Sequence, residues 1–260
     1  MKPQIVLATT ETPDGGSMGL YQHDEGFAIK INGLPLMSSR QHESELALAR
    51  LGCAHLVKQD APHVLIGGLG MGYTLRQTLD MLGAGATVTV SELLPDVVDW
   101  NREYFKELNG QPLEDKRTEL IVGDIFPLLS SAEDRFDALL LDIDNGPSAT
   151  TDTSNSQLYT REGIEMCKRA LRKDGSLAVW SAEPSKAFEE LLVSCNLQVR
   201  RYKVPAYAGT TKNSRFVWVA AASEKLLPPG GGAPRPAKKK KPKGKRTFRK
   251  RFLPGSESAL

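Results

Sequence analysis

The chain has 260 residues, of which 40% are hydrophobic and 25% are charged, as in a globular domain with a solvated surface. This length suits one large α/β domain with appendages, or two small domains, and needs no disulfides or metals to form a core. No stretch approaches the ~20 apolar residues of a membrane span, and the apolar run at residues 5–8 is too short for a signal peptide. We therefore expect a cytoplasmic protein with no membrane partner.

The net charge of +3 conceals two parts of opposite charge. Residues 235–251 contain 11 Lys and Arg residues and no acid, whereas residues 1–234 contain 30 acidic and 23 basic residues. An acidic body is compatible with a small cationic substrate. The basic segment 235–251 could contact a nucleic acid or another polyanion, or could merely increase solubility.

Cysteine and histidine residues show no metal-binding pattern. The three cysteines, Cys53, Cys167 and Cys195, are odd in number and far apart, which is typical of buried, reduced thiols in a cytosolic protein. The four histidines do not form an HExxH motif. We therefore predict that the protein holds no metal.

The first part of the chain contains four short apolar runs, at residues 5–8, 19–22, 27–31 and 34–37. Turn residues separate them, and Asn32-Gly33 between two of the runs is a typical hairpin turn. Apolar residues at helical spacing then predict a helix over about residues 40–57, capped by Ser38 or Ser39. Residues 1–60 are thus predicted to form a small antiparallel β region and a connecting helix.

From Pro62 onward, predicted strands alternate with predicted helices. The strands fall at residues 63–67, 87–91, 119–122, 136–141 and 176–181, the helices at 73–82, 94–108, 163–171 and 185–193, and two more strands follow at 198–204 and 215–221. Such alternation predicts a doubly wound, mostly parallel, Rossmann-like α/β sheet over residues 61–225. No periodic apolar pattern remains after Lys225, and residues 226–260 are predicted to be a disordered basic tail.

The first strand of this series runs directly into the glycine-rich sequence Gly67-Gly-Leu-Gly-Met-Gly72. Glycines allow a sharp turn and a close approach of a ligand to the backbone, beside a helix N-terminus. Glu92 ends the next strand, at about the 20-residue interval where an acid contacts a ribose in dinucleotide folds. The alternative for Glu92 is a solvated acid in a loop.

Two further acidic positions follow strands of the same predicted sheet. Asp124 could hydrogen-bond the amino group of an adenine, or could cap the next helix. Asp142 and Asp144 follow a continuously apolar strand, and carboxylates at such strand ends are costly unless they are paired or used. A turn formed by Asn145-Gly-Pro explains the end of this segment but does not explain Asp142.

Together these segments resemble the class I S-adenosylmethionine-dependent methyltransferase-like fold and, more narrowly, the spermidine synthase (polyamine aminopropyltransferase) family. The narrower resemblance covers roughly residues 20–220. It includes Gln41-His42-Glu43 where the family has Tyr-His-Glu, and Asp142-Ile-Asp-Asn-Gly-Pro where the family has Asp-Ser-Ser-Asp-Pro-x-Gly-Pro. Leu158-Tyr159 and the helix after it resemble the family's segment beyond that loop.

The resemblance implies a transferase that uses decarboxylated S-adenosylmethionine or S-adenosylmethionine. Asp142 and Asp144 would be catalytic, because a carboxylate can accept the proton of an attacking amine. The residues implied at the cofactor are Gly67, Gly68, Leu69, Gly70, Gly72, Glu92, Asp124, Ile125 and Asp142. Those implied at the substrate are Gln41, His42, Glu43, Asn145 and Tyr159. Gln41 and Asn145 replace the family's tyrosine and second aspartate, and the loop is shorter.

Three functions remain open from the sequence. The first is transfer of an aminopropyl or related group to a small cationic amine, in keeping with the acidic body. The second is methyl transfer from S-adenosylmethionine, for which the basic segment favours a nucleic acid or ribosomal partner. The third is a non-catalytic relative that retains the nucleotide-binding fold. By resemblance alone, a homodimer is also implied.

Overall fold

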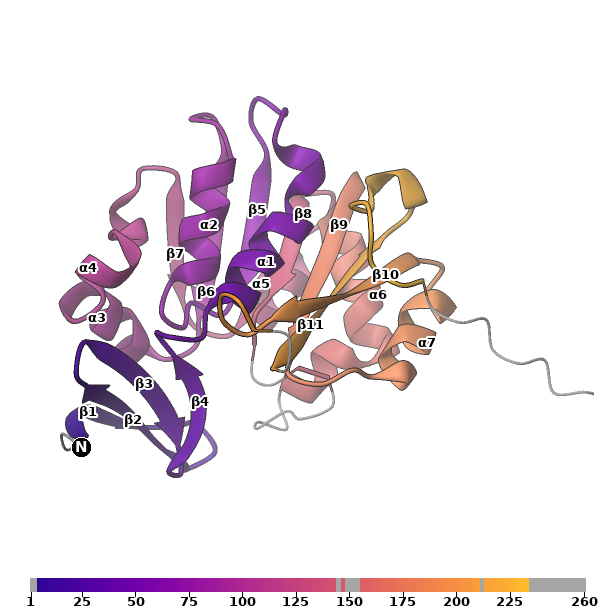
Figure 1. Cartoon of the computed structure of the whole chain (residues 1–260). Coiled ribbons are helices and arrows are strands. Elements are labelled where there is room, and N and C mark those ends of the chain that lie inside the picture. The colour runs from indigo at the N-terminus through magenta and orange to yellow at the C-terminus, as the bar shows by residue number, and fades with distance from the viewer. Residues whose placement is uncertain (1–3, 144–145, 148–154, 211–212, 234–260) are drawn as a thin grey trace, which may run out of the picture.

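The computed structural model describes residues 4–143, 146–147, 155–210 and 213–233, which form two sheets (Figure 1). The smaller sheet is antiparallel, with its strands in chain order. Its members are β1 (Ile5–Glu11), β2 (Ser17–His23), β3 (Gly26–Ile31) and β4 (Leu34–Ser38). The predicted N-terminal β region is therefore confirmed, with each strand slightly longer than its apolar run.

The larger sheet has seven strands in the order β10-β11-β9-β8-β5-β6-β7. They are β5 (His63–Gly67), β6 (Thr87–Glu92), β7 (Thr118–Val122), β8 (Phe136–Leu141), β9 (Leu171–Ser181), β10 (Gln198–Pro205) and β11 (Ser214–Ala221). Neighbours among β5 to β9 are parallel, and β11 is antiparallel to both β9 and β10. The predicted mostly parallel sheet is confirmed. The chain order reverses between β5 and β8, and ligands bind at such switch points, outside the strand carboxyl ends.

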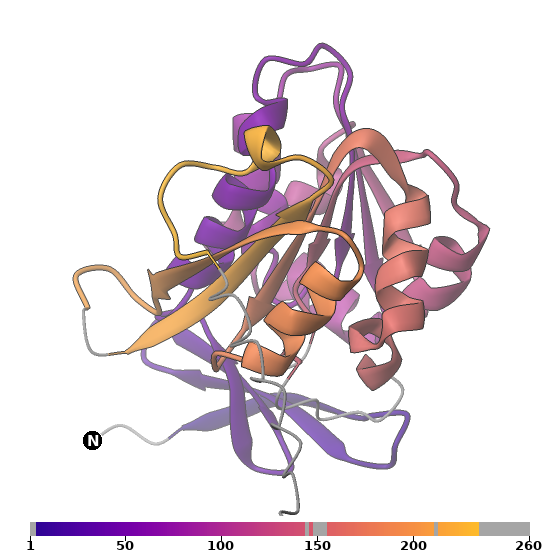
Figure 2. The same ribbon diagram turned by 90° about the vertical axis from the view of Figure 1, so that its right-hand side faces the viewer.

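Helices cover both faces of this sheet (Figure 2). On one face, α1 (Glu43–Gly52), α2 (Tyr73–Met81) and α3 (Pro95–Glu103) share a core with Val64 and Ile66 of β5. On the other face, α5 (Ile125–Ser131), α6 (Arg161–Ala170) and α7 (Lys186–Ser194) pack with Leu65. This split follows from the alternation of side chains along a strand. The short elements are α4 (Lys106–Asn109), η1 (Ala54–Leu56), η2 (Pro112–Glu114), η3 (Asn155–Tyr159) and η4 (Glu224–Leu226).

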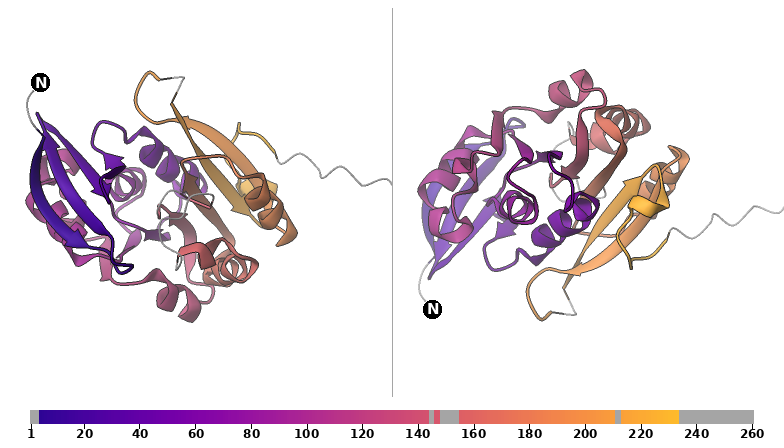
Figure 3. Two further views of the ribbon diagram at one scale, coloured as in Figure 1. Left: turned by 90° about the horizontal axis from the view of Figure 1, so that it is seen from below. Right: turned by 90° about the horizontal axis from the view of Figure 1, so that it is seen from above.

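A third apolar cluster fixes the small sheet against α2 and α3. Leu20 and Ile29 of the small sheet are buried with Met71, Trp100 and Phe105 of the larger domain. Burial of each such side chain contributes about 1.5–3 kcal/mol. In Figure 3, the small sheet and the pair β10–β11 lie on opposite sides of the parallel strands. The small sheet therefore forms a fixed wall at one side of the α/β domain.

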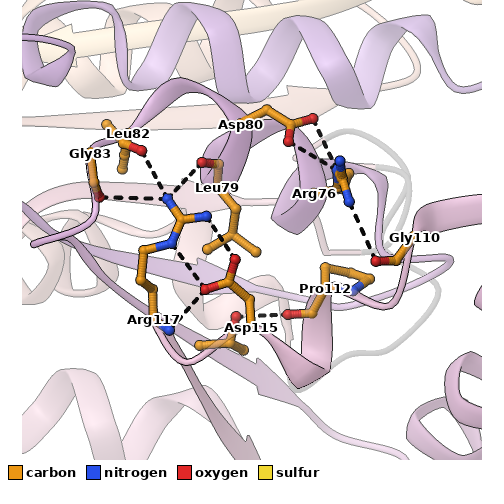
Figure 4. Close-up of polar contacts among 10 residues, drawn as sticks. Arg76, Leu79, Asp80, Leu82, Gly83, Gly110, Pro112, Asp115 and Arg117 are labelled. Atoms are coloured by element: carbon orange, nitrogen blue, oxygen red, sulfur yellow. Dashed lines mark hydrogen bonds and ion pairs between the residues drawn. The ribbon is translucent and has the colours of Figure 1, made fainter.

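Arg117 joins the start of β7 to the end of α2 (Figure 4). Its guanidinium donates 2.8 Å hydrogen bonds to the carbonyls of Leu79 and Leu82, which are at or just beyond the last turn of the helix. The same side chain hydrogen-bonds Asp115 and lowers the pKa of that carboxyl to about 2. The Arg117 side chain thus satisfies carbonyl groups at the end of α2 that lack a partner within the helix.

Two predicted helices differ from those observed. The helix predicted from residue 40 begins at Glu43, and neither Ser38 nor Ser39 caps it, because the Ser39 hydroxyl accepts a hydrogen bond from Phe27 N at 2.8 Å. The helix predicted over residues 94–108 is broken into α3 and α4. The break lies at Phe105, whose buried ring belongs to the cluster beneath the small sheet. Packing of this ring accounts for the interruption.

The ordered chain extends beyond the boundary predicted at residue 226. Leu227 is buried, and the carbonyl of Pro228 accepts hydrogen bonds from Tyr202 Oη at 2.6 Å and Arg200 Nη1 at 2.7 Å. Gly232 pairs with Arg201 through two backbone hydrogen bonds. Residues 226–233 therefore pack against β10, and the basic segment 235–251 lies outside the described residues.

Candidate active site

A cavity opens at the carboxyl ends of β5, β6, β7 and β8, where the small sheet meets the α/β domain. The glycine turn after β5, Glu92 and Asp142 form part of its wall. The opposite wall comes largely from apolar side chains of the small sheet and its first hairpin, including Met18, Ile29, Ile31, Leu36 and Met37. A hydrogen bond of 2.8 Å from Thr10 to Asp96 fastens that hairpin to α3. The cavity therefore lies at the switch point of the sheet.

The glycine turn presents bare backbone to this cavity at Gly68 and Gly70. Gly68 has φ of 90°, and a Cβ atom there would lie 2.3 Å from the carbonyl oxygen of Asp142. Gly70 has φ of 52°, and its Cβ would meet the end of the Met37 side chain at 2.6 Å. Gly67, Leu69 and Gly72 belong to the same turn but do not line the cavity. Close approach of a ligand to the backbone is thus possible at Gly68 and Gly70.

Glu92, which ends β6, braces the glycine turn. Its carboxylate accepts hydrogen bonds from Leu69 N at 2.8 Å and Leu94 N at 3.0 Å. Burial raises the pKa of Glu92, and these backbone donors oppose that shift. The carboxylate lines the cavity, so its contact with a ribose stays a prediction that the geometry permits.

Asp124 and Ile125 lie at the edge of the cavity after β7. The Asp124 carboxylate accepts a 2.9 Å hydrogen bond from Phe126 N and caps α5. The capping role considered from the sequence is therefore present. A contact between Asp124 and an adenine remains a prediction.

Asp142 directly follows β8 and lines the cavity. Its Oδ2 accepts a 2.6 Å hydrogen bond from the hydroxyl of Thr74, in the first turn of α2. Burial raises the pKa of Asp142 to about 6, against the opposing effect of the Thr74 hydrogen bond. Asp142 is consequently a carboxyl group that can gain or lose a proton near neutral pH.

Glu45 on α1 lines the same cavity and was not predicted from the sequence. It is 6% exposed, and its Oε2 accepts a hydrogen bond from Ser44 Oγ. Burial, followed by the negative charge of Asp142, raises the pKa of Glu45 to about 8, while the Ser44 hydrogen bond and, more weakly, Arg215 oppose the shift. The cavity therefore holds two carboxyl groups that interact with each other.

The helical periodicity of the sequence could have identified Glu45 as a buried acid. Residues three and four apart share a helix face, and Glu45 lies on the face of the buried Leu48 and Ala49. Glu43, two residues earlier, lies on another face, where it pairs with Arg50 at 3.6 Å. An acidic residue on the apolar face of a helix is costly to bury unless it is used.

The predicted substrate residues do not gather around the cavity. His42 stacks on Tyr73 with ring centroids 4.2 Å apart, and Gln41 is exposed. Tyr159 donates to the carbonyl of Ile143 at 3.3 Å, and its ring packs edge-on against Phe188. None of these residues, nor Glu43, lines the cavity. The remaining predicted positions, Asp144 and Asn145, lie outside the described residues.

Among the described residues, no group of three or more His, Cys, Asp or Glu side chains is placed to hold a metal ion. Cys53, Cys167 and Cys195 are all free and buried, as predicted. In the part of the chain with described structure, no helix combines the length and apolar character needed to cross a membrane.

Comparison with known proteins gives a family from sequence and a fold from structure. The family model "Spermine/spermidine synthase domain" matches residues 50–212. A polyamine aminopropyltransferase of Saccharolobus islandicus (strain Y.N.15.51) is 31% identical over 127 residues, which cover 49% of this chain and 41% of the relative. The chain thus matches less than half of the length of this curated relative.

Two solved structures share the fold at 19% sequence identity. The spermidine synthase of Thermotoga maritima superimposes with a TM-score of 0.70, over 86% of this chain and 76% of the other. A spermidine synthase in complex with the transition state analogue AdoDATO gives a TM-score of 0.71, over 86% and 77%.

The topology defines a doubly wound α/β protein, and its cavity lies at the switch point of the sheet. The family model covers more than half of the sequence. The chain therefore belongs to the spermine/spermidine synthase family, and the family resemblance seen in the sequence is confirmed.

Proposed function

We propose that this protein transfers an aminopropyl group from decarboxylated S-adenosylmethionine to a small cationic amine. The observation that carries the proposal is the pairing of Glu45 and Asp142 in one cavity with the glycine turn. The names of the curated relatives, polyamine aminopropyltransferases, support the same reaction.

The residues present fit an adenosyl donor. Gly68 and Gly70 both line the cavity and carry no side chain that would fill it, and a Cβ atom would clash with the Asp142 carbonyl at Gly68 and with the Met37 side chain at Gly70. Glu92 would hold the ribose, and Asp124 with Ile125 would border the adenine. The apolar wall from the small sheet suits the faces of a flat heterocycle.

Asp142 is the proposed proton acceptor. A bound sulfonium donor supplies a carbon already activated for displacement, because its leaving group is a neutral thioether. An attacking amine must be neutral, although a free alkylammonium has a pKa of about 10.4. Oδ2 of Asp142 already accepts from Thr74, so Oδ1 is the atom available to take the proton from the amine.

Glu45 would help to bind the cation. With pKa values of about 8 and about 6, Glu45 and Asp142 together hold roughly one negative charge at neutral pH. An approaching ammonium favours ionisation of Glu45 and so gains a second carboxylate partner. The same charges repel the carboxylate of S-adenosylmethionine, which favours the decarboxylated donor.

Product analysis tests the proposal. The purified protein is incubated with decarboxylated S-adenosylmethionine and a panel of diamines and triamines, and the products are identified by mass spectrometry. We expect methylthioadenosine together with an aminopropylated amine, and loss of both in Asp142→Asn. Production of S-adenosylhomocysteine from S-adenosylmethionine would instead indicate methyl transfer. Nucleotide binding without turnover of any amine would indicate a non-catalytic relative.

Three further proposals accompany this function. Contact of the basic segment 235–251 with a nucleic acid or another polyanion is supported by its charge. A homodimer is supported by the family resemblance, and a cytoplasmic location by the composition. Filter binding to RNA with and without residues 235–251, and light scattering of the purified protein, test the first two.

A further inference from the structure

Two buried asparagines lie behind the glycine turn. Asn101 on α3 and Asn109 at the end of α4 are 3% and 4% exposed. Nδ2 of Asn101 donates to the carbonyl of Gly70 at 2.7 Å, and Nδ2 of Asn109 donates to the carbonyl of Met71 at 3.0 Å. Two successive carbonyl groups of the turn are therefore bound by side-chain amides.

The two asparagines also bind each other. Nδ2 of Asn109 donates to Oδ1 of Asn101 at 2.9 Å. Asn101 donates a second hydrogen bond to Val97 O at 2.8 Å, and Oδ1 of Asn109 accepts from Gln111 N at 3.0 Å. Every polar atom of both side chains is used, which makes a fully satisfied buried network with one arrangement.

This network fixes the peptide planes of the turn. A trans peptide holds its carbonyl and its N–H on opposite sides, so fixing a carbonyl also fixes the following amide. The amide after the Met71 carbonyl, Gly72 N, donates to Leu69 O at 2.8 Å and closes the turn. Glycines lose much conformational freedom on ordering, and a network that orders them beforehand reduces that cost when a ligand binds.

The glycine at position 72 is explained by the same network. A Cβ atom on Gly72 would lie 2.7 Å from Asn109 Nδ2 and 2.9 Å from Asn101 Oδ1. Gly72 does not line the cavity, unlike Gly68 and Gly70. Its lack of a side chain therefore makes room for the asparagines.

The segment that carries Asn109 is itself tied to the helix after the turn. Arg76 on α2 donates to the carbonyl of Gly110 at 3.3 Å and pairs with Asp80 (Figure 4). The buried Phe105, between α3 and α4, holds the same segment against the small sheet. Asn101 and Asn109 thus act from rigid elements on both sides of the break between α3 and α4.

We propose that Asn101 and Asn109 are positioning residues, which hold the turn at Gly67–Gly72 in the conformation that binds the adenosyl group. The identity of this ligand rests on the proposed function. Neither asparagine lines the cavity, so both act on the ligand through the backbone of the turn.

Calorimetry with 5′-deoxy-5′-methylthioadenosine tests this role. The variants are Asn101→Ala, Asn109→Ala and the double variant. The control is Ser176→Ala, which also removes a buried side-chain hydrogen bond to backbone, from Ser176 Oγ to Gly52 O at 3.0 Å, on the opposite part of the sheet. We expect each asparagine variant to weaken binding about tenfold, the scale of one buried hydrogen bond, and the control to bind as the wild type does.

The double variant adds a second test. Because Asn109 donates to Asn101, the two losses overlap, and the double variant should weaken binding by clearly less than about a hundredfold. Thermal unfolding without ligand should show a loss for every variant, at least as large for the asparagine variants as for Ser176→Ala, because each asparagine takes part in more hydrogen bonds. If an alanine variant fails to fold, Asn101→Ser and Asn109→Ser replace it, because they leave space for a bridging water. These variants should also weaken binding, by a smaller factor than the alanine variants.

The positioning role would be overturned if the asparagine variants bound the ligand as tightly as the wild type while losing as much thermal stability as Ser176→Ala. The asparagines would then have a structural role only. Absence of any binding by the wild type would instead overturn the proposed function, and with it the ligand assigned to the turn. The two failures are thereby told apart.

Discussion

Thr74 donates a 2.6 Å hydrogen bond to the carboxylate of Asp142, which joins the first turn of α2 to the residue after β8. The glycine turn leads directly into the same helix, so one helix start positions both the proposed donor-binding turn and the proposed proton acceptor. The bond also favours the ionised form of Asp142, against the burial that raises its pKa to about 6.

Replacement of Thr74 by valine should therefore raise the pKa of Asp142. Activity requires the ionised carboxylate, so the acid limb of the pH profile of kcat/KM should lie near pH 6 in the wild type. In Thr74→Val we expect this limb to move upward by about one unit, the scale of one charge-assisted hydrogen bond.

Thr78→Val is the matched control, since Thr78 is also buried on α2 but donates to Thr74 O at 2.8 Å and not to Asp142. It should keep the wild-type profile. An acid limb that stays in place in Thr74→Val would show that this bond does not set the ionisation of Asp142.

Glu45 should make the stability of the ligand-free protein fall as pH rises. Its pKa is about 8 in the folded state against an ordinary value of 4.5, so the native state binds more protons than the unfolded state between these values. The free energy of unfolding must then decrease from about pH 4.5 to about pH 8. In Glu45→Gln this decrease should be smaller, by ~4 kcal/mol over the range.

Urea unfolding at pH 5 and pH 8.5 measures the effect. Glu43→Gln is the control, because Glu43 is two residues away on another face of α1, paired with Arg50. It should retain the wild-type slope. Equal slopes in Glu45→Gln and the wild type would contradict a buried carboxyl at position 45 that is protonated at neutral pH.

The segment after β11 should contribute to stability although it contains little regular structure. A chain ending at Ala233 keeps the buried Leu227 and the hydrogen bonds to Pro228 O, whereas a chain ending at Lys225 loses both. We expect the shorter chain to have a free energy of unfolding ~3 kcal/mol lower than the longer one. Denaturant titration of both compares them, and equal values would show that the packing of residues 226–233 is energetically unimportant.

The order of the strands and of most helices could be predicted from the sequence because the buried parallel strands are short apolar runs separated by helical periodicity. The short helix α5 between β7 and β8 was not among the predicted ranges. Phe136–Leu141 is buried at all six positions and matches its predicted range. Helix ends were less accurate, since caps such as Thr160, which accepts from Gly163 N, depend on side-chain hydrogen bonds that periodicity does not contain.

The residues of the proposed donor site could be predicted to lie together, because the carboxyl ends of parallel strands meet at one edge of the sheet. Gly68, Glu92 and Asp142 all lie on that edge. Glu45 comes from a helix before the sheet, whose orientation no strand order fixes. His42 and Glu43, which the resemblance implied at the substrate, do not line the cavity, and a role for them there stays a prediction.

The residues that support the glycine turn and Asp142 could not be predicted from the sequence, for a different reason. Thr74, Asn101 and Asn109 act through hydrogen bonds between segments that are distant in sequence. Each is an ordinary polar residue in a helical stretch, and only the folded chain brings it to its partner.

The proposed function requires a cavity that accepts an adenosyl donor at the glycine turn and a positive charge at Glu45 and Asp142. Calorimetric affinities for decarboxylated S-adenosylmethionine and S-adenosylmethionine at pH 7.5 test this most directly. We expect the decarboxylated donor to bind at least about tenfold more tightly, because two neighbouring acids repel the additional carboxylate. Equal affinities, or a preference for S-adenosylmethionine, would contradict the account.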